Sequence, residues 1–170
     1  MAYNARPNQT SKYTQGYYKL INESKYVSNP NQIIYRSSLE MKFCKFLDEN
    51  KKVLKWGSEI ISIPYKSYDN KMHTYHIDFY AEVENLDHPN GMERLLVEVK
   101  PHVESMRIIT NSPPQKPKKS TPTSLRNWEY ALKEFVKNKH KWSHAQEYAR
   151  IKNYKFVIVT EKTINKFIQM

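Results

Sequence analysis

The sequence has few of the features on which secreted, zinc-binding or membrane-spanning chains depend. Its single cysteine, Cys44, excludes an internal disulfide framework and a cysteine-rich zinc site. No apolar run approaches the roughly 20 residues that span a bilayer, and the polar residues 1–16 contain no signal-peptide core. There is also no internal repeat. We therefore expect a soluble, intracellular protein.

Acidic residues are scarce relative to basic ones. The chain has 28 Lys and Arg against 17 Asp and Glu, a formal net charge of +11. Because cations that neutralise backbone phosphates release counterions, nucleic acid is the first expected partner and an anionic membrane surface only the second. With 170 residues, one domain with a genuine core is expected. Residues 1–30 are rich in Asn, Gln, Lys and Tyr, which predicts a basic arm that either packs over the domain or orders on a partner.

The apolar pattern of residues 31–170 predicts helices alternating with strands. A helix is expected from Ser37 or Ser38 to about Asn50. Residues 53–54 and 59–64 supply the first strand. A second strand is expected over residues 74–83, where apolar and polar side chains alternate, and a third over residues 95–99. Two helical stretches then cover residues 125–152, and residues 156–159 are apolar on both faces, as in a central strand. A Pro- and Lys-rich loop is expected at about residues 104–123.

Two of these strands carry charged residues that suggest chemistry. Glu98 and Lys100 are two residues apart, so in a strand they project from the same face of an otherwise apolar segment. Asp78 lies on the preceding strand, and the two strands plausibly form an antiparallel hairpin across an Asn90-Gly91 turn. Charges in apolar surroundings need a partner or a metal, so this cluster predicts a divalent-cation site for phosphodiester hydrolysis.

The order αβββαβ, with Asp78 on one strand and Glu98-Val99-Lys100 on the next, resembles the PD-(D/E)xK nuclease superfamily. Ile77 stands where the superfamily's name has a proline. A longer pattern over residues 25–161 is similar to the TnsA-like head completion nucleases of T-even-type tailed phages. Its segments are Lys25-Tyr26, Ile34-Tyr35-Arg36-Ser37-Ser38-Leu39-Glu40, Trp56-Gly57-Ser58-Glu59, Ile63-Pro64-Tyr65, Glu98-Val99-Lys100-Pro101, Lys141-Trp142 and Val159-Thr160-Glu161.

The resemblance implies an α/β fold, with a central mixed sheet flanked by helices, and a set of site residues. Asp78 and Glu98, with the backbone carbonyl of Val99, are expected to hold Mg²⁺, for which Mn²⁺ would substitute. Lys100 is expected to position the attacking water and offset developing charge. Glu40 is expected to be catalytic and is a further candidate ligand. The expected DNA-binding lysines are Lys116, Lys118, Lys119 and Lys141.

Each of these residues has a structural alternative. Ser37 to Glu40 fits a capping box, in which the Glu40 carboxylate returns to the Ser37 amide. Asp78 is alternatively a solvated carboxylate at a strand end, and Glu98 with Lys100 an ordinary cross-strand ion-pair set. The run Lys116 to Lys119 is alternatively a soluble loop. Trp56 and Glu59 match the family pattern, but the sequence gives neither a chemical role.

The expected function is a Mg²⁺-dependent DNA endonuclease acting in phage head completion or on packaged DNA. Its expected partners are the DNA backbone, read with little sequence specificity, and phage head, portal or neck proteins, with no membrane. The expected location is the host cytoplasm, with incorporation in the virion. Two alternatives stay open: a non-catalytic head or neck component that binds DNA, and a TnsA-like or junction-resolving nuclease outside the virion. Intact Asp78, Glu98 and Lys100 favour catalysis.

Overall fold

A four-stranded mixed sheet lies at the centre of the protein. In the computed structural model, which describes residues 14–169, its strand order is β3-β6-β7-β8. The first three strands pair antiparallel, and β7 pairs parallel with β8. The strands are β3 (Val53–Ser58), β6 (Phe79–Glu84), β7 (Met92–Val99) and β8 (Lys155–Val159). The α/β class and the mixed central sheet expected from the sequence are thus confirmed.

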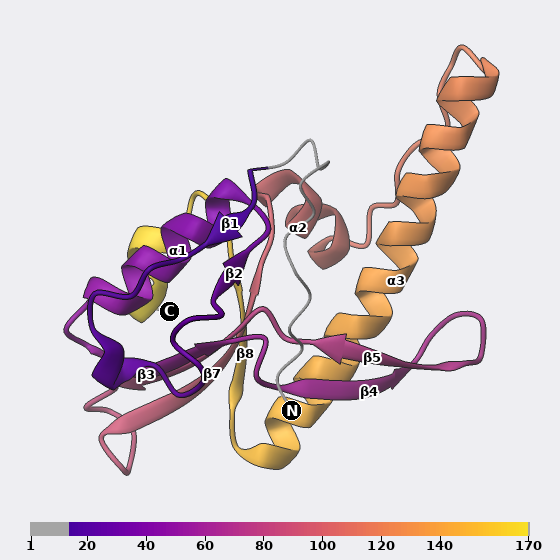
Figure 1. Ribbon diagram of the computed structural model, residues 1–170. Helices are drawn as coiled ribbons and strands as arrows, with labels where there is room; N and C mark the ends of the chain where they lie inside the picture. Colours follow the sequence, from indigo (N-terminus) through magenta and orange to yellow (C-terminus); the bar gives the residue numbers. More distant parts are fainter. Residues whose placement is uncertain (1–13, 170) are drawn as a thin grey trace.

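Helices cover both faces of this sheet, and two small ribbons lie beside it (Figure 1). Two-stranded ribbons form from β1 with β2 and from β4 with β5. The remaining elements are β1 (Gly16–Tyr17), η1 (Glu23–Lys25), β2 (Ile34–Tyr35), α1 (Ser38–Glu49), β4 (Ser62–Lys66), β5 (Met72–His76), α2 (His102–Ile109), α3 (Pro122–Lys152) and η2 (Ile164–Gln169). No helix among residues 14–169 is long and apolar enough to cross a membrane.

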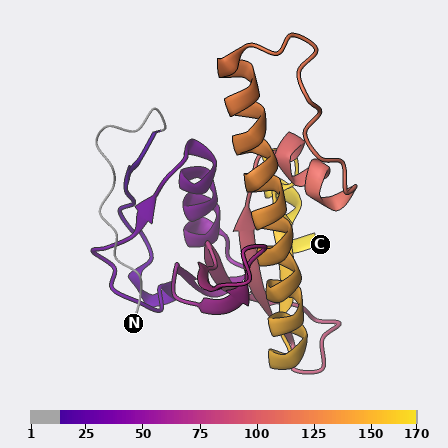
Figure 2. The ribbon, with the colours of Figure 1, turned by 90° about the vertical axis from the view of Figure 1, so that its right-hand side faces the viewer.

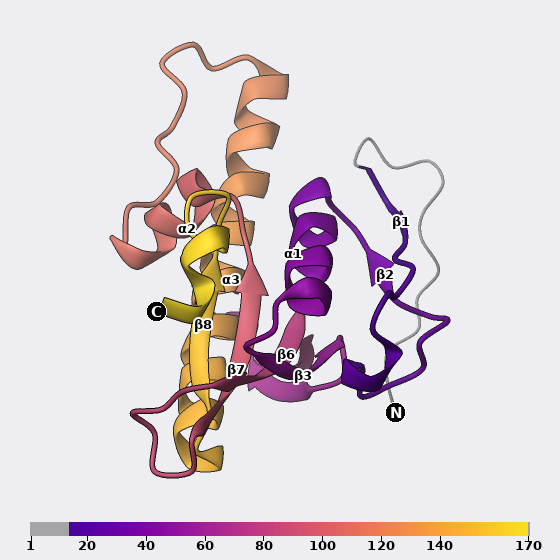
Figure 3. The same cartoon turned by 90° about the vertical axis from the view of Figure 1, so that its left-hand side faces the viewer.

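The two faces of the sheet bury separate cores. On one face, α1 and η2 contribute Phe43, Leu47 and Phe167 to a cluster that includes Val97 of β7. On the other face, α3 contributes Ala145 and Ala149 to a cluster with the β4–β5 ribbon and Leu96 of β7. Figures 2 and 3 show α1 and α3 on opposite sides of the sheet. Because both faces are covered, the second half of β7 (residues 95–99) is buried on both faces, and Glu98 lies on the α3 side with Leu96.

The N-terminal segment packs against α1 and β3 from residue 14 onward. Buried Asp48 of α1 accepts hydrogen bonds from the backbone amides of Ile21 (2.8 Å) and Asn22 (3.0 Å) and from the hydroxyl of Tyr18 (3.1 Å). Tyr26 lies edge-on against Trp56, with ring centroids 4.8 Å apart. The rest of the expected arm, residues 1–13, lies outside the described residues.

One expected strand is divided between two sheets. Residues 74–83 were predicted to run as a single strand, but the chain bends at Ile77 and Asp78, so that β5 pairs with β4 and β6 joins the central sheet. Tyr75 and Ile77 consequently pack in the α3-side core, whereas Phe79 and Ala81 pack in the α1-side core. The alternation holds within each half, but the two halves bury opposite faces.

The second half of the chain differs from the expectation in three places. The expected loop after Pro101 begins with the helix α2, and the irregular segment covers only residues 110–121. The two expected helical stretches form one continuous helix, α3, because residues 137–141 are polar but contain no glycine or proline to end it. Finally, β8 is an edge strand and not a central one; it is apolar on both faces because a helix covers each of them.

Candidate functional site

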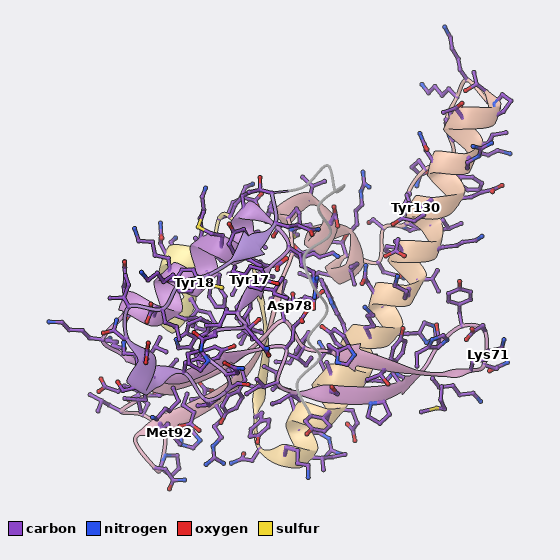
Figure 4. All side chains as sticks on the ribbon, viewed as in Figure 1. Tyr17, Tyr18, Lys71, Asp78, Met92 and Tyr130 are labelled. Carbon is purple, nitrogen blue, oxygen red and sulfur yellow. The ribbon has the colours of Figure 1, made fainter. Side chains whose placement is uncertain are left out.

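The β6–β7 pairing brings Asp78 and Glu98 together. Asp78 occupies the bend immediately before β6, and Glu98 is the penultimate residue of β7, with Phe79 opposite Val97. The Asp78 carboxylate accepts a hydrogen bond of 2.8 Å from the backbone amide of Val99. Asp78 therefore caps the end of β7, next to Glu98, near the middle of the molecule (Figure 4).

Glu98 is buried and has a specific partner. Its side chain is only 5% exposed, and one carboxylate oxygen accepts a hydrogen bond from the hydroxyl of Tyr75 on β5. Burial, together with the charges of Glu98 and Asp78, holds the pKa of Tyr75 well above its ordinary value. The hydroxyl therefore keeps its proton and remains a donor to Glu98.

The electrostatic surroundings of Asp78 are unfavourable for its negative charge. Burial raises the pKa of the Asp78 carboxyl well above its ordinary value, and the carboxylates of Glu98 and Glu40 raise it further. The Val99 amide and the Lys100 ammonium group act in the opposite direction. Such a site is relieved either by a proton or by a bound cation.

The side chains of Asp78 and Glu98 supply some, but not all, of the ligands that a hard divalent ion needs. Asp78 and Glu98 are oxygen donors of the type that Mg²⁺ and Mn²⁺ prefer. In the described part of the chain, however, no three His, Cys, Asp or Glu side chains lie close enough together to hold a metal ion. A Mg²⁺-type site here would use two carboxylates and complete its coordination with backbone oxygen and water, which is usual for this ion.

Glu40 lies in the first turn of α1, and both of its carboxylate oxygens are occupied. One accepts a hydrogen bond from the Arg36 amide (2.7 Å) and the other from the Ser37 hydroxyl (3.0 Å). Ser37 caps the helix by accepting the Glu40 amide (3.1 Å). The expected capping box is therefore altered, because the Glu40 carboxylate returns to the amide of Arg36 and not to that of Ser37. Burial raises the pKa of Glu40.

Arg36 and Glu59 connect Glu40 to Asp78. The Arg36 guanidinium group donates two hydrogen bonds of 3.2 Å to the Glu59 carboxylate. The Glu59 amide in turn donates to the backbone carbonyl of Asp78 at 3.0 Å. Glu59 has a left-handed backbone with φ 52°, a conformation that costs a residue other than glycine about 1 kcal/mol. This network gives Glu59 a physical role that the sequence did not provide.

Two lysines lie beside the carboxylates. Lys100 forms an ion pair of 3.7 Å with Glu104 of α2. Lys141 of α3 places its ammonium group 4.9 Å from the centre of the Tyr75 ring. Burial lowers the pKa of Lys141, and Lys137 and Lys100 lower it too, while Glu98 and Asp78 oppose the change. The structure thus groups Lys141 with Asp78, Glu98 and Lys100.

The other three predicted DNA-binding lysines lie elsewhere. Lys118 and Lys119 are exposed in the segment before α3, at the end of that helix farthest from the sheet (Figure 1). Lys116 is also exposed and has its ammonium group 5.8 Å from the centre of the Trp128 ring. The structure therefore does not bring these lysines to the carboxylates.

Sequence reasoning missed Tyr75, Arg36 and the role of Glu59. Arg36 and Glu59 stand inside the family pattern, so their presence there was a usable signal. Tyr75 gave none, because an apolar-facing tyrosine in an alternating strand is ordinary. Only the bend at Asp78, which turns β5 away from β6, brings the Tyr75 hydroxyl to Glu98.

Comparisons with known proteins agree with this geometry. The family described as TnsA-like endonuclease N terminal matches residues 50–161, a range that contains Asp78, Glu98, Lys100 and Lys141. The head completion nuclease of Enterobacteria phage T4 is 33% identical over 141 residues, which cover 82% of this chain and 86% of the relative. No solved structure matches the chain. The resemblance drawn from the motifs is confirmed: the chain belongs to the TnsA-like endonuclease family, whose core has the PD-(D/E)xK nuclease fold.

Proposed function

We propose that this nuclease is a metal-dependent DNA endonuclease whose catalytic residues are Asp78, Glu98 and Lys100. The observation that carries the proposal is the pairing of two carboxylates at the end of β7, with burial and like charges raising the pKa of Asp78. A divalent cation would relieve that repulsion. Perturbed carboxylates of this kind cluster at functional sites.

Asp78 and Glu98, together with the carbonyl of Val99, would hold Mg²⁺ or Mn²⁺. A bound ion of this type supplies Lewis acidity toward the phosphate and toward the attacking water. Tyr75 fixes the Glu98 carboxylate by donating to one of its oxygens, and the Val99 amide fixes Asp78 in the same way. Both carboxylates are therefore oriented before substrate arrives.

Lys100 and Lys141 would act on the phosphate. Lys100 follows Glu98 on the same face of the strand, and its only ion-pair partner in the described chain is the exposed Glu104. It is therefore available to orient the water and to offset charge on the phosphorus oxygens. Lys141, partly desolvated beside Glu98, would bind the phosphodiester. Hydrolysis of the P–O3′ bond would leave a 5′-phosphate and a 3′-hydroxyl, the products expected of the superfamily.

Glu40 would act indirectly. Because both of its oxygens accept hydrogen bonds from the Arg36 amide and the Ser37 hydroxyl, its role as a metal ligand would require those bonds to break. Its charge nevertheless raises the pKa of Asp78. We therefore place Glu40 at the edge of the site, where it adds negative potential that favours a cation.

Plasmid cleavage is the direct test of this activity. The purified protein should convert supercoiled plasmid to nicked or linear DNA with Mg²⁺ or Mn²⁺ and should not do so in EDTA. Asp87 is an exposed aspartate in the loop after β6, and Asp87→Ala serves as the matched control that keeps full activity. Cleavage that is equally fast in EDTA would exclude the metal-dependent mechanism.

We also propose that the enzyme acts in phage head completion, in the host cytoplasm or within the virion. Two findings support this role. The T4 relative is named a head completion nuclease, and its match to this chain covers 86% of the relative. The test is complementation of a T4 mutant that lacks its own head completion nuclease. The wild-type chain should restore infectious particles, and Asp78→Ala should not. Rescue by Asp78→Ala would instead indicate a non-catalytic head or neck component.

A further inference from the structure

The β4–β5 ribbon has one covered and one uncovered face. Ile63 pairs with Tyr75, and both side chains pack in the core formed with α3. Opposite pairs alternate between the faces of an antiparallel ribbon. The pairs that point the other way are exposed in the described structure: Pro64 with Thr74 and Lys66 with Met72. In Figure 2 the ribbon projects toward the viewer from between α1 and α3.

The uncovered face carries Lys66 and no carboxylate, and a second lysine, Lys71, is exposed in the turn at the tip of the ribbon. Asp69 is the single acidic residue in positions 62–76. It lies in the turn, where its carboxylate accepts the Lys71 amide at 3.0 Å and contacts the His73 ring at 3.1 Å. The tip also exposes Tyr68 (53%) and Met72 (65%). Lysines suit the phosphates of DNA, and exposed apolar side chains suit the thymine methyl groups that the major groove presents.

The ribbon is held in a fixed position relative to the carboxylates. At its root, Tyr75 donates to Glu98, and the Ile77 amide donates to the Ile61 carbonyl at 3.0 Å. On its covered face, the Tyr65 ring lies edge-on to the ring of His144 of α3, with centroids 6.0 Å apart. A molecule that rests on the ribbon is therefore placed with respect to Asp78 and Glu98.

We propose that the uncovered face and the tip of the β4–β5 ribbon bind double-stranded DNA that flanks the scissile phosphate. This inference rests on the proposed nuclease function and adds a substrate contact to it. A two-stranded ribbon is of a size that the major groove of B-DNA admits. From Tyr75 to the turn at Lys71 the ribbon extends about 13 Å at about 3.3 Å per residue, which is about four base pairs at about 3.4 Å each. The ribbon is therefore long enough to contact DNA several base pairs away from the cleaved bond.

The first test measures the salt dependence of binding. Fluorescence anisotropy in EDTA follows a labelled duplex of about three helical turns. Lys66→Gln/Lys71→Gln should lower the slope of log affinity against log salt by about two, because two phosphate contacts are lost. The matched control is Lys51→Gln/Lys52→Gln, which removes two exposed lysines from the turn after α1, at the opposite end of that helix from Glu40. An equal slope for the ribbon variant and the wild type overturns the proposal.

The second test labels a single introduced cysteine, which is possible because the natural sequence has no exposed thiol. Cys44 is fully buried, so a cysteine introduced at Lys71→Cys takes up an aryl azide label selectively. On illumination with the duplex, this label should crosslink to DNA, and the same label at Lys51→Cys should not. Equal crosslinking from both positions, or none from residue 71, contradicts the ribbon contact.

Self-association is the competing use of the uncovered face. Sedimentation of the DNA-free protein distinguishes it: if Lys66→Gln/Lys71→Gln reduces the sedimenting mass and leaves the salt slope unchanged, the face binds a second copy and the proposal is wrong. Binding and crosslinking in EDTA require no cleavage. Failure of the ribbon contact and failure of the nuclease function are therefore separately visible.

Discussion

The β4–β5 ribbon and the α3 tip, which consists of the first turns of α3 and the segment 110–121 before it, both carry lysines away from the core. They are connected to the site differently. The ribbon is bonded to Glu98 through Tyr75. The α3 tip is held by its own local contacts: the Trp128 indole donates to the Pro114 carbonyl (2.9 Å), and the Ser124 hydroxyl donates to the Lys119 carbonyl (2.8 Å). Changes in the ribbon should therefore affect chemistry as well as binding, whereas changes at the α3 tip should affect binding alone.

Removing a carboxylate should have the largest effect, because cleavage would be lost whichever of the two regions binds the DNA. Asp78→Ala or Glu98→Ala should lower plasmid cleavage by about 10³-fold or more, since each would unload the metal. Circular dichroism and thermal unfolding should show a folded domain, because loss of one charge relieves repulsion in the metal-free protein. Normal cleavage by purified Asp78→Ala would show that the nuclease site lies elsewhere.

Lys100→Ala separates turnover from affinity within the site. We expect a rate about 10²-fold to 10³-fold lower at saturating DNA, because a contact with the reacting phosphate stabilises the transition state more than the ground state. The dissociation constant for DNA should be nearly unchanged in the same preparation. A loss of affinity in step with the loss of rate would make Lys100 a backbone-binding residue.

Tyr75→Phe tests the bond between ribbon and site. The metal concentration that gives half-maximal cleavage should rise by about tenfold to a hundredfold, because Glu98 loses the donor that orients it. Much of the rate should return at saturating metal, which a purely structural defect would not allow. Tyr65→Phe is the control, because it removes a hydroxyl of the same ribbon that is not hydrogen-bonded to Glu98. It should need the same metal concentration as the wild type.

The α3 tip should respond in the opposite way. Replacing Lys116, Lys118 and Lys119 with Gln should weaken binding to all DNA sequences alike and lower the salt slope by about one for each lost contact. Saturating DNA at low salt should restore most of the cleavage rate, because the carboxylates are untouched. An unchanged slope would mean that these lysines are merely solvated.

The smallest expected effect is on the stability of the metal-free protein. The folded-state pKa of Asp78 lies above its ordinary value, so its ionisation destabilises the fold. This penalty is absent well below the ordinary pKa, grows as the pH rises from the ordinary pKa to the folded-state pKa, and is complete above the folded-state pKa. In EDTA, Asp78→Asn should therefore raise the unfolding temperature relative to the wild type, and more so near neutral pH than at about pH 5. Asp87→Asn should show no such pH-dependent gain.

Elements that are determined by short-range sequence patterns, such as a helix cap or a turn, could be predicted from the sequence. The Ser37 cap and the apolar spacing of α1 gave its bounds, and alternation together with the turn predicted the β6–β7 hairpin that carries the carboxylates. The short helix α2 was missed because it follows Pro101 and buries only Ser105 within its span. The continuity of α3 was missed because the polar residues 137–141 interrupt the apolar stripe, although they contain no glycine or proline to end the helix.

Site residues whose positions follow from residue type and strand spacing could be predicted. Those whose positions depend on contacts between distant segments could not. Glu98 and Lys100 project from one side of β7 by the geometry of any strand. The contact between Tyr75 and Glu98 depends instead on the bend at Asp78, which alternation alone does not reveal. The place of Lys141 depends on α3 crossing the ribbon, a long-range contact.

Asp48 determines how much of the N-terminal segment can be removed. This buried carboxylate takes its donors from Tyr18, Ile21 and Asn22, all of which precede the family-matched residues 50–161. A chain shortened to begin after residue 22 would leave a buried negative charge without these donors, at the end of the helix that carries Glu40. Deletions up to residue 15 retain β1 and all three donors, so the Asp48 carboxylate of α1 stays paired.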